Sequence, residues 1–387
     1  MFILGMVKRK KSAIIILQGC DRGGHHENQE CFAKCCSYSD SIYTYGLWEC
    51  SPGDGKWQRS PGNSFFFDRR GTDRYAQDDV AKTGVTVLCF PAGAKTGVDI
   101  SGGGPASRET PVLDPTKENI GIHAIVLSGG SAYGLAAADG VMQCLEEHDI
   151  GFDTGFARVP LVVQSCIFDL SYGSAKVRPD KKMGYEACLD ALNKGRAVSG
   201  SAGAGTGATV GKLCGMGQSM KSGIGYHAVQ IGNLKMGAVV VLNALGDVYS
   251  VETGKKIAGL MNRERTSFQD SVAELYRISQ PSDLFTRTNT TIGAIVTNGN
   301  FDKAELTTIA GQTRNAYARA IKPVGTLADG DTVYASSCGK PVQADVNMAG
   351  TLAAEVMAKA IEKAITAARM EDKEYLSHCL GLSAKDK

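Results

Sequence analysis

The chain has 387 residues and nearly balanced charges, with 42 Lys and Arg against 40 Asp and Glu and a net charge of +2. This balance argues against nucleic acid or an anionic membrane as a partner. No apolar run is long enough to cross a bilayer. The 47 glycines indicate many tight turns rather than a helical bundle.

Residues 1–78 differ in composition from the rest of the chain. They contain both Trp, five of the twelve Cys and the pair His25-His26. The basic run 8–11 followed by an apolar run is similar to a signal sequence, but the apolar part is too short. The Cys and His could bind zinc, although their spacing is not that of usual ligands. We interpret 1–78 as an atypical N-terminal extension, with zinc binding as the lesser alternative.

The cysteines of the remaining chain point to a reducing compartment. Cys89, Cys166, Cys188 and Cys214 lie in apolar sequence settings, as reduced core thiols do. We therefore expect a cytoplasmic protein, with export as the weaker alternative.

Residues 79–387 have the pattern of a single packed domain. Strands are predicted at 85–90, 122–128, 159–170, 223–231, 234–243, 247–250, 290–298 and 331–337. Helices are predicted from the turn at 129–134 to about 148 and at 184–195, 267–277, 303–317 and 348–370, with Asp302 as the cap of the helix at 303–317. The segments 223–231, 234–243 and 247–250 are expected to be consecutive antiparallel strands. Antiparallel strands with helices before and after them predict a layered α+β sandwich.

Two Gly-rich loops imitate nucleotide-binding motifs. The turn at 129–134 follows a strand and precedes a helix, but its spacing is not GxGxxG. The loop at 199–212 fails the P-loop pattern twice, at Thr206 and at Leu213. We therefore expect no nucleotide cofactor. The first loop would still present Tyr133 at a helix start, and the second would deliver Lys212 to a site.

A loop runs directly into an apolar strand at Asn289-Thr290. If this peptide bond breaks, Thr290 carries both a hydroxyl and a free α-amine, and the amine can act as base for the hydroxyl. An α-amine titrates near pH ~8, so much of it can accept a proton. The alternative is an ordinary core strand preceded by a loop.

Other polar residues at strand ends or Gly turns could complete such a site. Asn243 ends a strand, and Asp329 and Asp331 flank a glycine at the start of another. Carboxylates can hold an ammonium group, while the Asn243 amide and the Tyr133 hydroxyl can donate to an oxyanion. Each also has an ordinary explanation: turn residues for Asn243 and the Asp pair, a helix-end aromatic for Tyr133 and a solvated charge for Lys212.

Two other hydrolase classes are disfavoured. Only six His occur, and there is no G-x-S-x-G elbow, which argues against a Ser-His-Asp enzyme. The zinc-peptidase motif HExxH is also absent, so no metal is expected.

Four motifs resemble the self-processing aminopeptidase family, which includes L-aminopeptidase/D-esterases, β-peptidyl aminopeptidases and endo-type 6-aminohexanoate-oligomer (nylon oligomer) hydrolases. The resemblance covers residues from about 80 to 365. The motifs are Thr83-Gly84-Val85-Thr86-Val87, Gly97-Val98-Asp99 with Ser107-Arg108-Glu109-Thr110, Leu127-Ser128-Gly129-Gly130-Ser131-Ala132-Tyr133-Gly134-Leu135 and Asn289-Thr290-Thr291-Ile292-Gly293.

The resemblance implies a four-layer αββα sandwich similar to N-terminal nucleophile hydrolases. It implies cleavage into 1–289 and 290–387, with the αβ units assembled as a homo-oligomer, a tetramer. It makes Thr290 the nucleophile and gives Asp329 and Asp331 the task of orienting its amine and hydroxyl. The remaining site residues it implies are Lys212 and Asn243, which line the site, and Tyr133, which with Asn243 stabilises the oxyanion.

Within the family, the Asn-Thr junction and the Asp-Gly-Asp pair look more like the nylon-oligomer branch. Members with a Ser nucleophile carry Ser and Glu in place of Asp329 and Asp331. A His common before Thr326 is Gly325 here.

The resulting hypothesis is a self-processed, cofactor-free amide hydrolase that acts on short peptides or ω-amino-acid oligomers through an acyl-enzyme. Two alternatives remain at this stage. One is an acyl transferase similar to ornithine acetyltransferase, and the other is an uncleaved, non-catalytic assembly subunit.

Overall fold

The computed structural model describes residues 48–50, 57–59, 76–118, 120–193, 197–277 and 289–382. All of them belong to one compact unit, Thr44–Lys387. The Cys/His cluster considered for zinc and the loop before Asn289 lie outside the described residues. None of the described helices has the length and apolar character needed to span a bilayer.

The described chain contains many helices and strands of very different lengths. The helices are α1 (Ala137–Glu147), α2 (Lys181–Asn193), α3 (Ser271–Arg277), α4 (Lys303–Ala320), α5 (Val346–Thr366) and α6 (Asp372–His378), with a 3-10 helix η2 (Ser131–Ala136) before α1. The strands are β1 (Trp48–Cys50), β2 (Trp57–Arg59), β3 (Ala76–Asp78), β4 (Thr83–Ile100), β5 (Ser107–Arg108), β6 (Ile122–Ser128), β7 (Phe152–Asp153), β8 (Arg158–Val159), β9 (Val162–Cys166), β10 (Thr209–Val210), β11 (Met220–Lys221), β12 (Ile224–Ile231), β13 (Leu234–Asn243), β14 (Asp247–Tyr249), β15 (Lys256–Ala258), β16 (Thr290–Gly299), β17 (Ile321–Lys322) and β18 (Thr332–Val342).

Strand β4 connects two layers of strands because each half of it pairs with a different partner. Residues 95–100 pair with β18, and residues 85–94 pair with β6. The first layer has the order β12-β13-β16-β18-β4, and the second has the order β4-β6-β9-β5. Within these two layers, pairing is antiparallel except for β16 with β18 and β6 with β9, and the hairpin β1–β2 extends the first layer through a parallel pairing of β1 with β12.

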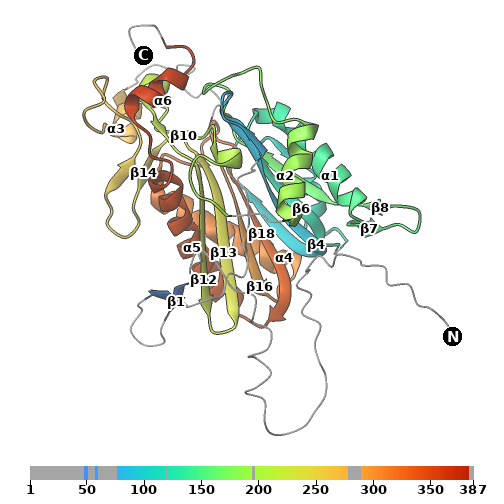
Figure 1. Ribbon diagram of the computed structural model, residues 1–387. Helices are drawn as coiled ribbons and strands as arrows, with labels where there is room; N and C mark the ends of the chain where they lie inside the picture. Colours follow the sequence, from blue (N-terminus) through green and yellow to red (C-terminus); the bar gives the residue numbers. More distant parts are fainter. Residues whose placement is uncertain are drawn as a thin grey trace, which may run out of the picture. The chain divides into compact units, whose positions relative to one another are not determined.

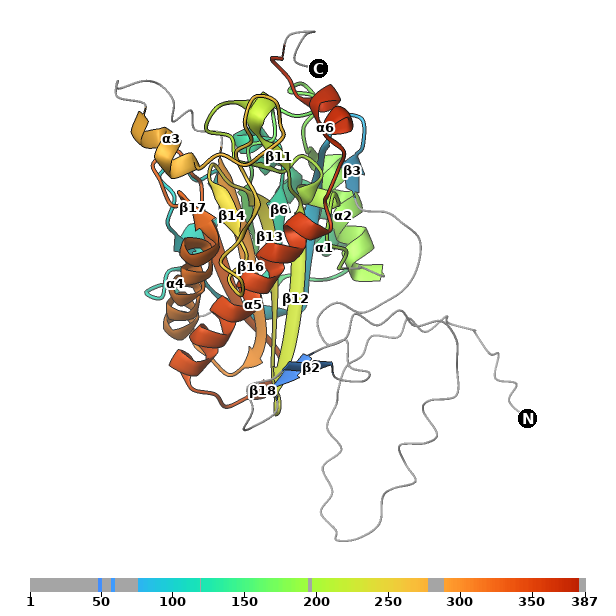
Figure 2. The same cartoon turned by 90° about the vertical axis from the view of Figure 1, so that its left-hand side faces the viewer.

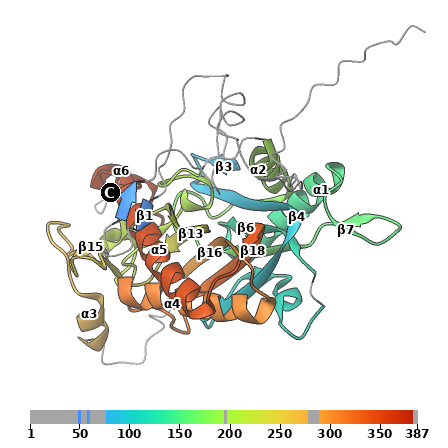
Figure 3. The same cartoon turned by 90° about the horizontal axis from the view of Figure 1, so that it is seen from below.

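Side chains alternate between the two faces of each strand, and this period of two builds separate cores. On β13, Val240 packs with α4 and α5, whereas Val239 and Val241 pack between the strand layers. On β6, Val126 packs with α1 and α2, whereas Leu127 faces the space between the layers. Three apolar clusters thus separate four layers, with the two pairs of helices on opposite outer faces (Figures 1–3).

This arrangement confirms the predicted αββα sandwich. Several local predictions were also accurate: β6 and β13 have the predicted bounds, and Asp302 forms a capping box with Glu305 at the start of α4. Asp302 accepts the Glu305 N–H at 2.8 Å, which satisfies one of the unpaired donors at the helix start.

Other local predictions were wrong. The strand expected at 85–90 extends to 83–100, because its second half pairs with β18. The strand expected at 159–170 is interrupted at Pro160, which cannot donate to a ladder, and ends at Cys166. Strand β14 pairs with β15 and β17 rather than continuing from β13. Cys214, expected in the core, is exposed.

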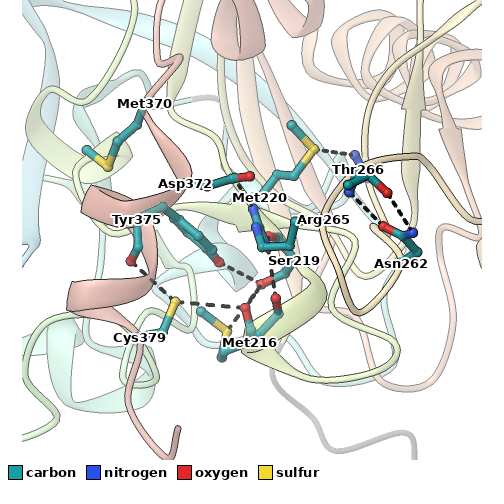
Figure 4. A network of polar contacts seen from close by, with 12 residues as sticks. Met216, Ser219, Met220, Asn262, Arg265, Thr266, Met370, Asp372, Tyr375 and Cys379 are labelled. Atoms are coloured by element: carbon teal, nitrogen blue, oxygen red, sulfur yellow. Dashed lines mark hydrogen bonds and ion pairs between the residues drawn. The ribbon is translucent and has the colours of Figure 1, made fainter. Parts of the chain in front are cut away.

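A C-terminal clamp, defined here as α6 with its flanking residues 370–380, holds the end of the chain against Met216, Ser219 and Arg265. The buried Tyr375 hydroxyl lies 2.6 Å from Ser219 Oγ, and the Arg265 guanidinium donates to Asp372 at 2.5 Å. Figure 4 shows these four side chains meeting at one point. The Tyr375 ring also stacks on Tyr172, with centroids 5.4 Å apart. The clamp therefore joins segments on both sides of the Asn289–Thr290 bond.

Candidate active site

Thr290 is the first residue of β16 and lies between two neighbouring strands. Across the antiparallel pairing its partner is Asn243, the last residue of β13. On the other side, Asn289 forms a parallel bridge with Asp329, just before β18 begins. Only 5% of Thr290 is exposed. Three polar segments therefore meet where the ends of β13, β16 and β18 come together.

The carbonyl oxygen of Asn289 has two hydrogen-bond donors. The Gly330 N–H donates to it at 3.0 Å, and the Thr290 hydroxyl donates to it as well. The hydroxyl thus lies beside the carbonyl whose peptide bond precedes Thr290. The Asn289 side chain is buried, and neither of its polar atoms has a hydrogen-bond partner among the residues that the structure describes.

The two carboxylates are buried rather than placed on a surface turn. Asp331 accepts the Thr291 N–H at 2.6 Å through one oxygen and the Gly325 N–H at 3.0 Å through the other. Burial, reinforced by the neighbouring Asp329 charge, raises the pKa of Asp331 to about 7. Burial also raises the pKa of Asp329, whose carboxylate accepts the Thr326 N–H and hydroxyl.

Lys212 is buried, although a solvated position was the ordinary expectation. Its Nζ donates to the Asn243 carbonyl at 2.9 Å. Burial lowers the pKa of Lys212 to about 7, and the charges of Asp329, Asp169 and Asp331 oppose that shift. An amine with this pKa can both accept and release a proton near neutral pH.

The Asn243 side chain is fixed by residues on two other segments. Its Oδ1 accepts the Thr209 N–H at 3.1 Å, and its Nδ2 donates to the Phe168 carbonyl at 2.9 Å. The amide nitrogen has two hydrogens, so one remains for another acceptor.

Tyr133 differs from the five buried residues, because 61% of it is exposed. It lies on η2, and the Arg178 guanidinium stands 3.9 Å from its ring centroid. The structure therefore brings Thr290, Asp329, Asp331, Lys212 and Asn243 together in the interior and places Tyr133 at the surface.

Two residues at the site were not found from the sequence. Asp169 is buried and accepts the Gly130 N–H at 2.7 Å and the Thr83 hydroxyl at 2.6 Å, which anchors the turn before Tyr133. Burial raises the pKa of Asp169 to about 6. Gly330 supplies the N–H described above. Its place between two candidate carboxylates was the available signal, whereas Asp169 had none, because the sequence placed it inside the strand predicted at 159–170.

The arrangement has the parts of an acyl-transfer site. A hydroxyl lies beside a carbonyl, a backbone N–H donates to that carbonyl oxygen, and an amine and two carboxylates are buried nearby. Within the described ranges, no three His, Cys, Asp or Glu side chains are grouped so that they could hold a metal ion.

The fold is that of the N-terminal nucleophile hydrolases. An L-aminopeptidase/D-Ala-esterase/amidase from Ochrobactrum anthropi, described as a variant of that fold, superposes with a TM-score of 0.54 at 16% identity, covering 78% of this chain and 82% of the other. A β-aminopeptidase from Burkholderia sp. gives a TM-score of 0.50 at 20% identity, covering 78% and 82%. These structures establish the fold.

The sequence comparisons establish the family: residues 69–374 match peptidase family S58, and the chain belongs to it. An uncharacterized aminopeptidase of Mycobacterium leprae is 37% identical over 306 residues, which cover 74% of this chain and 83% of that protein. A 6-aminohexanoate-oligomer endohydrolase of Agromyces sp. is 34% identical over 301 residues, covering 73% and 80%. The chain is therefore an amide hydrolase, as the sequence motifs predicted.

Proposed function

We propose that the protein is a self-processing amide hydrolase whose nucleophile is Thr290. The observation that carries the proposal is the contact of the Thr290 hydroxyl with the Asn289 carbonyl, together with the Gly330 N–H on the same oxygen. A nucleophile and an oxyanion donor at one peptide bond are what an intramolecular attack needs.

Maturation begins when Thr290 Oγ attacks the Asn289 carbonyl carbon. Lys212, with a pKa of about 7, takes the hydroxyl proton, and the Gly330 N–H holds the oxyanion that forms. Breaking the C–N bond transfers the proton to the leaving amine and leaves an ester on Thr290. Water then hydrolyses the ester, giving a carboxylate on Asn289 and a free hydroxyl and α-amine on Thr290.

Turnover repeats the same chemistry on a substrate amide. The Thr290 α-amine takes the hydroxyl proton, and the carboxylates of Asp329 and Asp331 orient the ammonium. Asn243 and Tyr133 donate to the substrate oxyanion, and Lys212 lines the site. The acyl-enzyme is released by water. In this proposal each mature unit consists of the fragments 1–289 and 290–387, and several such units form a homo-oligomer.

The substrates we propose are short peptides and ω-amino-acid oligomers. The support for the second class is the similarity to 6-aminohexanoate-oligomer endohydrolases and the Asn-Thr junction. The similarity to aminopeptidases supports the first.

The test combines intact-mass analysis with an amide panel. Purified wild-type protein should separate into 1–289 and 290–387, and N-terminal sequencing of the smaller fragment should begin at Thr290. Thr290→Ala should remain intact and inactive, whereas Thr290→Ser should keep part of both activities. Asn289→Ala should still be cleaved, because the attacking group is on Thr290. Normal maturation of Thr290→Ala would exclude this nucleophile.

A further inference from the structure

Arg178 lies directly over the ring of Tyr133 at the surface. Its guanidinium carbon is 3.9 Å from the ring centroid, a distance at which a cation is attracted to an aromatic face. Arg178 Nε donates to the Ala175 carbonyl at 2.9 Å, which fixes the plane of the guanidinium. The group is therefore both oriented and half exposed.

The two terminal nitrogens of Arg178 are not engaged by the described part of the chain, where its only hydrogen bond is through Nε and no ion pair forms. Asp169 and Asp180, the nearest carboxylates before and after Arg178 in the sequence, have other partners. Asp169 accepts from Thr83 and Gly130, and Asp180 accepts the Met183 N–H at 2.8 Å. A planar guanidinium with two free donors matches the geometry of a carboxylate.

The Arg178 segment and the active site are linked by short contacts. Pro179 packs on the turn before Tyr133 so closely that a Cβ on Gly130 would lie 2.8 Å from its Cδ. The same turn is anchored by Asp169, and the carbonyl of the preceding Phe168 accepts the Asn243 amide. Asn243 is the strand partner of Thr290. A series of direct contacts thus connects the segment of Arg178 and Tyr133 with the strand partner of Thr290.

We propose that Arg178 and Tyr133 form a subsite that binds a free carboxylate of the substrate. This inference rests on the proposed function, because it takes Tyr133 to lie at the substrate oxyanion. It assigns the substrate class more narrowly: amides that carry a carboxylate at one end, as unblocked peptides and ω-amino-acid oligomers do. Preference for a substrate with a free carboxylate requires only the oriented positive charge of Arg178 and no closed pocket around the carboxylate.

The experiment uses matched substrates that differ only at one end. The linear 6-aminohexanoate trimer is compared with its C-terminal carboxamide, and trialanine with trialanine amide. The measured quantity is kcat/KM for the carboxylate divided by kcat/KM for the carboxamide. Loss of a charge-assisted pair should lower this ratio about 10-fold or more in Arg178→Gln, mainly through KM. Arg178→Lys should fall between the wild type and Arg178→Gln, since it keeps the charge but not the planar fork.

Lys176→Gln is the control, because Lys176 is an exposed cation in the same loop and its variant should leave the ratio unchanged. The inference is overturned if Arg178→Gln has the same carboxylate-to-carboxamide ratio as the wild type. This holds even if the rates on both substrates fall, because an equal loss on both would mean only that Arg178 supports the Tyr133 ring. A wild-type enzyme that cleaves no member of either pair overturns the proposed substrate class and the inference with it.

Discussion

Asn243, the last residue of β13, lies directly opposite Thr290, the first residue of β16. The pairing places the amide of Asn243 and the hydroxyl of Thr290 at the same end of the first strand layer. At the same end, Lys212 donates a hydrogen bond to the Asn243 carbonyl, and Asp331 accepts one from the Thr291 N–H. A ladder register therefore places Thr290 and Asn243, and hydrogen bonds attach the loop residues Lys212 and Asp331 to the same two strands.

Asp331→Asn should lower kcat by ~10²-fold or more, as when the group that orients a catalytic base is lost. It should also cost about 1–3 kcal/mol of unfolding free energy, because both Asp331 oxygens accept backbone N–H groups and an Asn can accept through only one. Rates and urea melts on the purified variant measure both effects. Asp345→Asn is the control, since Asp345 caps α5 and Asn caps equally well. Near-wild-type turnover in Asp331→Asn would remove the Asp pair from the mechanism.

Lys212→Met should change how stability depends on pH. Burial lowers the Lys212 pKa to about 7 from an ordinary value of 10.5, so between these pH values the folded chain binds fewer protons than the unfolded chain. Wild-type stability should therefore rise with pH through this window, relative to the variant, by up to about 1.4 kcal/mol per pH unit. Denaturant melts at pH 7, 8, 9 and 10 measure the difference. The exposed control Lys340→Met should differ from the wild type by the same unfolding free energy at every pH. If Lys212→Met behaved in the same way, Lys212 would not be a buried amine.

Gly330→Ala should slow both maturation and turnover by about 10-fold or more, because misplacing a reacting group is costly. A Cβ at this position would lie 2.9 Å from the Gly104 carbonyl and 3.0 Å from Thr290 Oγ1. The time course of cleavage on a denaturing gel reports the first effect and amide hydrolysis the second. Gly311→Ala on α4 is the matched control, because its Cβ would meet nothing closer than 3.8 Å. Normal rates in Gly330→Ala would mean that Gly330 is not close to the reacting atoms.

Thr83→Val should destabilise the protein by about 1–3 kcal/mol, because it leaves a buried Asp169 oxygen without its donor. The turn that carries Tyr133 depends on the same carboxylate, so activity should fall as well. Thr83→Ser keeps the hydroxyl and should restore both properties, which separates the hydrogen bond from the loss of volume. Equal behaviour of the Val and Ser variants in urea melts would count against this role of Asp169.

Tyr375→Phe should lower the free energy of unfolding by about 1 kcal/mol, the value of one ordinary hydrogen bond. The bond to Ser219 joins what would become two fragments after cleavage. The fragments should therefore separate at a lower urea concentration, as size-exclusion chromatography in urea would detect. Asp372→Asn removes the charge of a half-exposed carboxylate but keeps an oxygen that can accept from the buried Arg265, so it should cost less. A larger effect from Asp372→Asn than from Tyr375→Phe would reverse the assigned importance of the two contacts.

Local patterns carried much of the prediction. The apolar strands at 122–128 and 234–243 were assigned with the observed bounds, and Asp302 was identified as a helix cap. These features depend on neighbours within a few residues, so a single sequence contains their cause. The family motifs added the fold and drew attention to Thr290 before any geometry was known.

The tertiary structure decided what depends on residues far apart in the chain. The sequence identified Lys212, Asn243 and Asp331 as candidate site residues, but only the fold buries them, and burial shifts the pKa of Lys212 and of Asp331 toward 7. The full length of strand β4 could not be predicted from the sequence, because its second half pairs with β18, more than 200 residues away in the chain. Arg178 drew no attention in the sequence, since its place over Tyr133 comes from the packing of one loop on another. Local propensity acts between near neighbours, whereas desolvation and strand pairing act between segments that only the folded chain brings together.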